Sequence, residues 1–287
     1  MDVHSVVVTG VSTGIGRGIS TVLVRHGVHV FGSVRSRKDA DSFAKELGSL
    51  VTPLVFDVTD RAAVEAAAQT VRQKLAGRTL SGLVNNAGVA VFGPLMHVPI
   101  DDVRRQMEVN LLGPLLVSQA FLPLLGADRS LSGPRGRIVN IGSIGGKIAF
   151  PFLGPYAASK FALEGLSESL RRELMLFGID VVVIGPGAVA TPIWGKGEKA
   201  DTSQYAATEY NETLRKFGDY MVQNGRAGLA PERIGAVVWS ALSSRRPRVR
   251  YAVVPRAFSS WVVPRLLPKR MVDRSIARSL GWRQRAS

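Results

Sequence analysis

A tyrosine, a lysine and a serine are spaced as expected for a proton-transfer site. Tyr156 and Lys160 are four residues apart in a helix-compatible segment, which places both side chains on one helix face. A lysine ammonium beside a phenol favours the phenolate and lowers the tyrosine pKa, so the phenol could act as a general acid or base near neutral pH. Ser143, at the end of the preceding predicted strand, could hold the reacting oxygen for Tyr156.

A glycine-rich turn lies near the N-terminus, between a predicted strand and a predicted helix. Glycines allow a tight turn and a close approach of the backbone to a pyrophosphate, and the helix N-terminus offers N–H groups and a positive dipole end to the anion. This strand–turn–helix context favours dinucleotide binding over a plain structural turn. The residues assigned to the turn are Gly10, Ser12, Thr13, Gly14, Ile15 and Gly16.

The ends of the second and third predicted strands supply further groups for a nucleotide. After the second strand there is no acidic residue to bind the ribose 2′-hydroxyl of NAD, and Arg35 and Arg37 stand there instead. Guanidinium groups suit a 2′-phosphate, so the pattern favours NADP(H) over NAD(H), unless both arginines are simply solvated. Asp57 and Val58 end the third strand near the expected adenine edge, although Asp57 could equally begin the next helix.

The fourth predicted strand leads into Asn85-Asn86-Ala87-Gly88. Ligands of a doubly wound sheet bind beyond the carboxyl ends of its strands, and a small turn there lets the backbone approach a cofactor. We therefore assign Asn85, Ala87 and Gly88 to the cofactor site, the alternative being an ordinary Asn-Gly-type turn.

Strand and helix patterns alternate along most of the chain, which positions these groups. Several strands are continuous Val/Ile/Leu runs, as in parallel sheets covered on both faces. The sequence predicts a single α/β domain, a Rossmann-type doubly wound parallel sheet of about seven strands with helices on both faces. The predicted strands are 5–9, 28–34, 50–56, 80–85, 137–143, 179–185 and 249–254, and the predicted helices are 15–26, 38–47, 60–76, 100–125 and 157–177.

Six motifs in this order resemble those of the short-chain dehydrogenase/reductase family. The resemblance covers residues 5–254, and all six motifs match in sequence order. They are TGVSTGIG at 9–16, NNAG at 85–88, Asn110 within VNLLG at 109–113, Ser143, YAASK at 156–160 and PGAVAT at 186–191.

The resemblance implies a role for each matched residue. Tyr156 would be the acid/base, Lys160 would lower its pKa and bind the nicotinamide ribose, and Ser143 would bind the substrate oxygen. Asn110 would support a water-mediated proton path to Lys160, although it could instead be a core asparagine that kinks its helix. Thr191 would bind the nicotinamide carboxamide. The other cofactor residues in this segment would be Pro186, Gly187 and Val189.

Residues 149–156 and 191–194 resemble the branch that acts on retinoids, steroids and similar hydrophobic alcohols. The resemblance implies an NADP(H)-dependent oxidoreductase that interconverts a hydroxyl and a carbonyl on a hydrophobic substrate. Alternatives are an NAD-dependent member and a non-catalytic NADP-binding sensor or scaffold. Gly185 departs from related enzymes, which often carry a larger residue there. Apolar residues near the motifs could line a substrate pocket: Phe92, Phe150, Phe152, Leu153, Ile193 and Trp194.

The basic charge is concentrated at the C-terminus. The chain of 287 residues has a net charge of +15, of which residues 245–287 carry +11. We divide it into a catalytic domain, 1–254, with a lid insertion at 187–230, and a C-terminal extension, 255–287. In the extension, 269–280 predicts a basic amphipathic helix that packs on the domain, packs on a second subunit or contacts a membrane peripherally.

Composition excludes several other classes of protein. The chain has no cysteine, and its four histidines show no paired metal spacing, so we expect no metal site. No recognisable nucleic-acid module accompanies the basic tail. We expect no signal peptide and no transmembrane helix, hence a cytoplasmic enzyme, at most peripheral to a membrane. The family resemblance suggests a homodimer or homotetramer with helices 100–125 and 157–177 at the interface.

Overall fold

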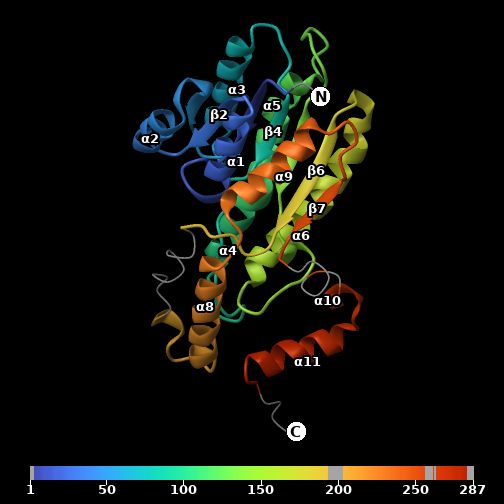
Figure 1. Ribbon diagram of the computed structural model, residues 1–287. Helices are drawn as coiled ribbons and strands as arrows, with labels where there is room; N and C mark the ends of the chain where they lie inside the picture. Colours follow the sequence, from blue (N-terminus) through green and yellow to red (C-terminus); the bar gives the residue numbers. More distant parts are fainter. Residues whose placement is uncertain (1–2, 193–202, 256–260, 262, 283–287) are drawn as a thin grey trace.

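The computed structural model describes residues 3–192, 203–255, 261 and 263–282. Seven parallel strands form one sheet in the order β3-β2-β1-β4-β5-β6-β7, which confirms the doubly wound prediction (Figure 1). The order reverses between β1 and β4, and this switch point is where such sheets bind ligands. The strands are β1 Ser5–Val8, β2 His29–Val34, β3 Val51–Val55, β4 Gly82–Asn85, β5 Arg137–Ile141, β6 Asp180–Pro186 and β7 Arg250–Val253.

Helices cover both faces of the sheet, and strand β1 shows why its sequence is continuously apolar. Val6 and Val8 point into the core on the face of α1, α2 and α9, while Val7 points into the core on the face of α3, α5 and α6. All three side chains are fully buried, as expected for a strand covered on both sides. The helices are α1 Gly14–Arg25, α2 Arg37–Leu47, α3 Arg61–Leu75, α5 Gly113–Phe121, α6 Gly154–Glu173 and α9 Pro231–Ser243.

The helix predicted over 100–125 is not continuous. It consists of α4 Ile100–Met107, a π turn η2 Glu108–Leu112, α5, and a short 3-10 segment η3 Leu122–Leu125. Pro114 explains the break, because it lacks an N–H group and its ring crowds the carbonyl of Asn110 one turn earlier. The backbone widens into a π turn instead, and Asn110 lies in it.

Segment Ile100–Leu125 is also, by length and composition, the one candidate membrane span among the described residues, contrary to our expectation. Its second half nevertheless belongs to the core. Val117, Phe121 and Leu125 are fully buried together with residues of α3 and the central strands. Core helices of proteins without any membrane span satisfy the same criterion, so this segment is weak evidence for one.

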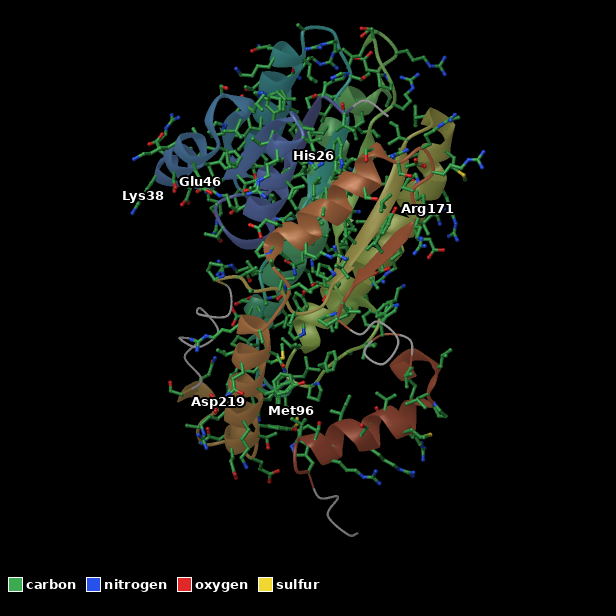
Figure 2. The ribbon with its side chains drawn as sticks, viewed as in Figure 1. His26, Lys38, Glu46, Met96, Arg171 and Asp219 are labelled. Carbon is green, nitrogen blue, oxygen red and sulfur yellow. The ribbon has the colours of Figure 1, made fainter. Side chains whose placement is uncertain are left out.

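The described parts of the segments predicted as a lid and a C-terminal extension lie at the carboxyl end of the sheet. Within the predicted lid the structure describes η6 Ser203–Tyr205 and α8 Asn211–Arg226. The extension contains α10 Val263–Leu266 and α11 Lys269–Ser279, the latter matching the predicted helix. Figure 1 shows α8 and α11 at the same end of the molecule, and Figure 2 shows Met96 and Asp219 there.

Candidate active site

The glycine turn after β1 has a geometry that only glycine fits. Gly10 has φ +71°, and a Cβ atom on it would lie 2.9 Å from Cα of Ala87. A Cβ atom on Gly16 would lie 2.2 Å from the carbonyl oxygen of Gly10. The turn therefore packs directly against the loop after β4. A groove without side chains results, and its shape suits a pyrophosphate.

The first turn of α1 is open to an anion. Thr13 is the N-cap, and within the described chain its side chain makes no capping hydrogen bond and no acidic residue occupies the first turn. Free N–H groups and the positive dipole end therefore face the groove. Arg17 supports the turn, because it donates to the carbonyl oxygen of Ser12 at 3.1 Å. The residues assigned to the pyrophosphate thus fit that group.

Thr9 and Asn86 connect the two loops at the switch point, and we did not assign either residue from sequence. The Thr9 hydroxyl accepts hydrogen bonds from the backbone N–H groups of Asn86 and Ala87, both at 2.9 Å. The Asn86 amide donates to the carbonyl oxygens of Thr9, at 2.8 Å, and Gly10. The positions of Thr9 and Asn86 in their motifs could have indicated this role from sequence. Each is a polar residue beside a glycine-containing turn, where its side chain can form hydrogen bonds with the other turn.

The Asn85 side chain faces the core rather than the cofactor groove. Its amide donates to Asn140 Oδ1 at 2.8 Å and to Ser118 Oγ at 3.0 Å. The physical reason is strand alternation, since Asn85 is the last residue of β4 and Asn86 points the other way. The assignment of Asn85 to the cofactor site rests on the approach of the turn backbone to the cofactor and stays a prediction.

The segment after β6 reaches the glycine turn. A Cβ atom on Gly14 would lie 3.2 Å from Cβ of Thr191, so the two residues are in contact across the groove. Gly187 donates to the Val253 carbonyl oxygen at 2.9 Å, and Val189 is buried. With Pro186 at the end of β6, the structure places this segment beside the turn, as its predicted role requires.

The residues predicted to select the nucleotide lie at the same edge of the sheet. Arg35 and Arg37 follow β2 and are exposed. Asp57 Oδ1 accepts hydrogen bonds from the Thr59 N–H and hydroxyl, at 3.0 and 2.8 Å. Asp60, not Asp57, is the N-cap of α3, which removes the alternative role for Asp57. Val58 is buried, and contact of either residue with adenine stays a prediction.

Tyr156, Ser143 and Lys160 meet beyond the carboxyl ends of β5 and β6. The Ser143 hydroxyl lies close enough to the Tyr156 phenol to lower the pKa of that phenol. The Ser143 hydroxyl also accepts from the Gly145 N–H at 2.9 Å, which fixes its direction. Lys160 Nζ lies 5.9 Å from the centroid of the Tyr156 ring and donates to the Ile141 carbonyl oxygen at 2.9 Å. Three groups predicted from two distant motifs are thus assembled in one place.

The pKa shifts in this site differ from our expectation. Burial raises the pKa of Tyr156, and the hydrogen bond from Ser143 offsets only part of that effect. Burial also lowers the pKa of Lys160 from 10.5 to about 8. Lys160 is itself desolvated, and its ammonium group points at the Ile141 carbonyl oxygen. It therefore does not lower the pKa of the Tyr156 phenol in this form of the protein.

We predict a pH-dependent stability difference between the wild type and Lys160→Met. Folded Lys160 loses its proton near pH 8, whereas the unfolded chain keeps it up to pH 10.5. The unfolded state binds more protons in this window, so the free energy of unfolding of the wild type rises with pH relative to the variant. Urea titrations between pH 8 and ~9.5 should show a rise of up to ~1.4 kcal/mol per pH unit. Parallel curves would contradict the assigned pKa.

Asn110 connects the π turn to the catalytic helix. Its amide donates to the Val89 carbonyl oxygen at 2.9 Å and to the Ser159 hydroxyl at 3.2 Å, and its oxygen accepts from the Val89 N–H. The Ser159 hydroxyl in turn donates to the Tyr156 carbonyl oxygen at 2.7 Å. Asn110 is thus a buried residue in a distorted helix, yet one bonded to the Tyr156 turn. Its part in a proton path to Lys160 stays a prediction.

An aromatic cluster lies between the Tyr156 helix and the lid. Phe152 is its centre, with φ +62°, a strained conformation for a bulky residue. Its ring contacts Phe217 of α8 at a centroid distance of 5.5 Å and Trp282 of the extension at 6.1 Å. Ile193 and Trp194 lie outside the described residues. The other members of the cluster are Phe92, Phe150, Leu153, Tyr205, Tyr210, Leu214, Met221 and Leu280.

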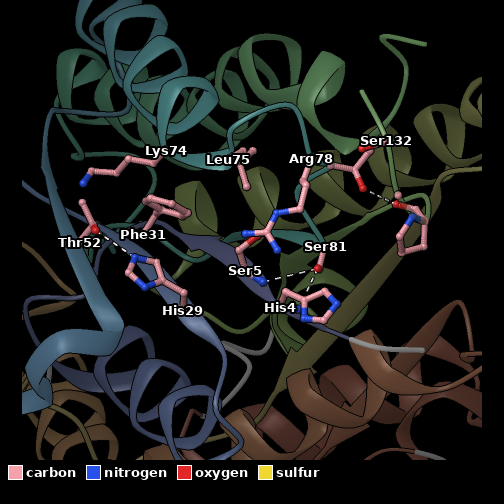
Figure 3. Close-up of a pocket in the computed structure, with 13 residues that line it drawn as sticks. His4, Ser5, His29, Phe31, Thr52, Lys74, Leu75, Arg78, Ser81 and Ser132 are labelled. Atoms are coloured by element: carbon pink, nitrogen blue, oxygen red, sulfur yellow. Dashed lines mark hydrogen bonds between the residues drawn. The ribbon is translucent and has the colours of Figure 1, made fainter. Parts of the chain in front are cut away.

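A separate cavity of about 520 Å³ opens at the opposite, amino edge of the sheet (Figure 3). His29 Nε2 lies 2.9 Å from Thr52 Oγ1 in it, Lys74 comes from the last turn of α3, and Arg78 comes from the loop that follows that helix. Because parallel sheets bind cofactors at the carboxyl edge, this cavity is distinct from the candidate active site.

Comparisons with known proteins identify the family to which the chain belongs. The family described as short chain dehydrogenase matches residues 4–202. An NADPH-dependent 3-dehydrocapnine reductase of Ornithobacterium rhinotracheale is 39% identical over 96% of this chain and 96% of that protein. Retinol dehydrogenase 5 of Mus musculus is 34% identical over 93% of this chain and 85% of its own. The crystal structure of a short-chain dehydrogenase from Streptomyces avermitilis superposes with a TM-score of 0.75 at 26% identity, covering 98% and 97% of the two chains.

The chain belongs to the short-chain dehydrogenase/reductase family. Its relatives place it in the retinol- and steroid-dehydrogenase-like branch, and it is an NAD(P)-dependent oxidoreductase.

Proposed function

We propose that this protein uses NADP(H) to interconvert a hydroxyl and a carbonyl on a hydrophobic substrate. The observation that carries the proposal is the Ser143–Tyr156–Lys160 group at the carboxyl edge, beside a glycine turn that a pyrophosphate fits. A non-catalytic sensor or scaffold would not need this group.

Each of the three residues has a distinct task in the reaction. Bound NADP(H) supplies or accepts a hydride at the substrate carbon. The Ser143 hydroxyl orients the substrate oxygen, and Tyr156 donates its phenolic proton to that oxygen as the carbonyl is reduced. In the reverse direction the Tyr156 phenolate removes the hydroxyl proton. A charged Lys160 then stabilises the phenolate electrostatically and holds the nicotinamide ribose.

Arg35 and Arg37 support a preference for NADP(H). We expect the double variant Arg35→Ala/Arg37→Ala to lose ~10- to 100-fold in kcat/KM for NADPH, because charge-assisted bonds to a 2′-phosphate disappear, and to keep its kcat/KM for NADH. Steady-state kinetics with both cofactors measures this ratio. Arg25→Ala/Arg129→Ala, two exposed arginines elsewhere, is the matched control. A wild-type enzyme that prefers NADH would refute the assignment.

The aromatic cluster around Phe152 supports a hydrophobic substrate, because apolar rings beside a catalytic tyrosine bind apolar ligands. One relative is named for the reduction of 3-dehydrocapnine and another for retinol. A panel of 3-dehydrocapnine, retinal, steroid ketones, medium-chain ketones and 3-oxoacyl thioesters, followed by NADPH oxidation, tests the proposal. Turnover of polar sugars or short acids alone would contradict the substrate class, and no turnover by nucleotide-bound protein would contradict the activity.

We also propose a homodimer or homotetramer. Exposed Leu112 and Phe161, from the helices predicted at the interface, support this assembly. Light scattering measures the molar masses of the wild type and of Phe161→Glu in solution. Equal molar masses for the two proteins would contradict this interface.

Peripheral membrane contact is the proposal for the extension. In α11, the Val272, Ile276 and Leu280 row is half-buried and the Arg270, Arg274 and Arg278 row is exposed. Exposed Leu266 and Met271 beside these arginines support contact with anionic lipid. Sedimentation with anionic vesicles, with and without residues 256–287, tests it, and unchanged sedimentation after deletion would end the idea. The cytoplasmic location stays a prediction.

A further inference from the structure

A partly buried ion cluster around the buried carboxylate of Glu164 lies directly behind the Ser143 turn, and nothing in the reaction described above uses it. Glu164 is buried in α6, one turn after Lys160, and both its oxygens accept from Arg250 Nε, at 2.8 and 3.1 Å. Lys147, which follows the Ser143 turn, lies 3.3 Å from the second oxygen. The cluster therefore joins α6, the turn after β5, and the edge strand β7.

Arg250 also reaches the backbone of the catalytic serine. Its Nη2 donates to the carbonyl oxygen of Ser143 at 3.3 Å, while its Nε holds Glu164. The guanidinium lies over the Trp261 ring, 4.4 Å from the centroid, and this buried ring shields the ion pair from water. The planar guanidinium presents several donors in fixed directions, and the Nε–H and Nη2–H groups of Arg250 thereby bond two different acceptors at once.

Gly185 creates the space for this contact. A Cβ atom on Gly185 would lie 2.5 Å from Arg250 Nη2 and 3.3 Å from the Ser143 carbonyl oxygen. Related enzymes often carry a larger residue at the position of Gly185. In this protein the Arg250 side chain occupies the space that such a residue would fill.

We propose that Arg250, anchored by Glu164 and admitted by Gly185, is a positioning residue that holds the Ser143 backbone so that its hydroxyl meets Tyr156 and the substrate oxygen. The inference rests on the proposed function, since it assumes that Ser143 and Tyr156 touch the reacting oxygen. Loosening the residues that support a reacting group misplaces it and lowers turnover more than binding.

Two variants distinguish a role of Arg250 in positioning the Ser143 backbone from a purely structural role in which its ion pair with Glu164 holds β7 against α6. Arg250→Lys keeps a cation beside Glu164 but cannot bridge it to the Ser143 carbonyl oxygen. Gly185→Ala keeps both charges and pushes the guanidinium away from that oxygen. We expect each to lower kcat about 10-fold with little change in the KM for NADPH, and the double variant to be no worse than the poorer single one.

The pH dependence of kcat provides a second test, because a purely structural role of Arg250 would leave the pKa of Tyr156 unchanged. The hydrogen bond from Ser143 lowers the pKa of Tyr156, so displacing Ser143 raises that pKa. The acid limb of kcat for alcohol oxidation should therefore move to higher pH in both variants. Lys160 faces the phenol directly, and Lys147, Glu164 and Arg250 lie behind the serine turn; Gly185→Ala leaves all four ionisable groups in place.

Two further variants, Arg72→Lys as a control and Tyr156→Phe, distinguish failure of the positioning role from failure of the proposed function. Arg72→Lys makes the same substitution in a more exposed ion pair far from the site in sequence, Arg72–Asp128 at 2.8 Å, and should leave kcat and the acid limb unchanged. If Arg250→Lys and Gly185→Ala only lower the melting temperature and keep the wild-type kcat and pH profile, the positioning role is wrong while the proposed function stands. If Tyr156→Phe is fully active, the proposed function itself fails.

Discussion

Tyr156→Phe should lose ~10²- to 10⁴-fold in kcat while NADPH binding stays intact. Positioned general acid/base groups contribute factors of this size, and the Tyr156 phenol is the acid/base group that lies beside the Ser143 side chain. The ring remains, so packing against Gly145 and the cation contact with Lys160 are retained. Single-turnover NADPH oxidation and nucleotide titration by fluorescence measure the two quantities separately.

A second tyrosine provides the matched control for this substitution. Tyr220 of α8 is largely exposed, and Tyr220→Phe removes the same hydroxyl away from Ser143. We expect its kcat to equal that of the wild type. Activity of Tyr156→Phe within about twofold of wild type would mean that another group delivers the proton and that the mechanism is wrong.

Periodicity and order of motifs made the fold predictable. The continuous apolar runs specified strands buried on both faces, and each of the seven lies within two residues of its predicted bounds. The break at Asn110 was not predicted, because Pro114 competes with an otherwise regular helical pattern and its effect depends on what the widened turn can bond. Local pattern indicates that a helix exists but does not determine where tertiary bonds interrupt it.

Candidate site residues with distinctive chemistry could be proposed from sequence, whereas the residues that hold them in place could not. Tyr156, Lys160 and the glycines occupy a spacing that chance seldom produces. Thr9, Asn86 and Arg250 form hydrogen bonds between segments distant in sequence. Motif position could have marked Thr9 and Asn86 as candidates, but no local pattern identifies the bonding partner of any of the three. The direction of the Tyr156 pKa shift was wrong for a related reason, since spacing shows that a lysine is near but not how deeply both groups are buried.

Gly16→Ala should abolish tight nucleotide binding, because the added methyl group would meet atoms that cannot move freely. The Cβ atom would lie 2.2 Å from the Gly10 carbonyl oxygen and 2.5 Å from Asn86 Nδ2, which are bonded to each other. Either the turn or the start of α1 must shift, and a displacement of about 1 Å in a positioning element can cost on the order of 10²-fold. We also expect ~1–3 kcal/mol of lost stability without nucleotide, as for other overpacked sites.

Thermal denaturation with and without NADPH separates these two effects. At a ligand concentration about 100 times the wild-type Kd, binding stabilises the wild type by ~2.7 kcal/mol, whereas a variant with a 100-fold weaker Kd gains only ~0.4 kcal/mol. Gly218→Ala in α8 is the control, since a Cβ atom there meets nothing within 4 Å, and its ligand-induced stabilisation should match the wild type. Equal stabilisation of Gly16→Ala would instead place the pyrophosphate elsewhere, because a turn that tolerates this methyl group cannot be the surface against which the phosphates pack.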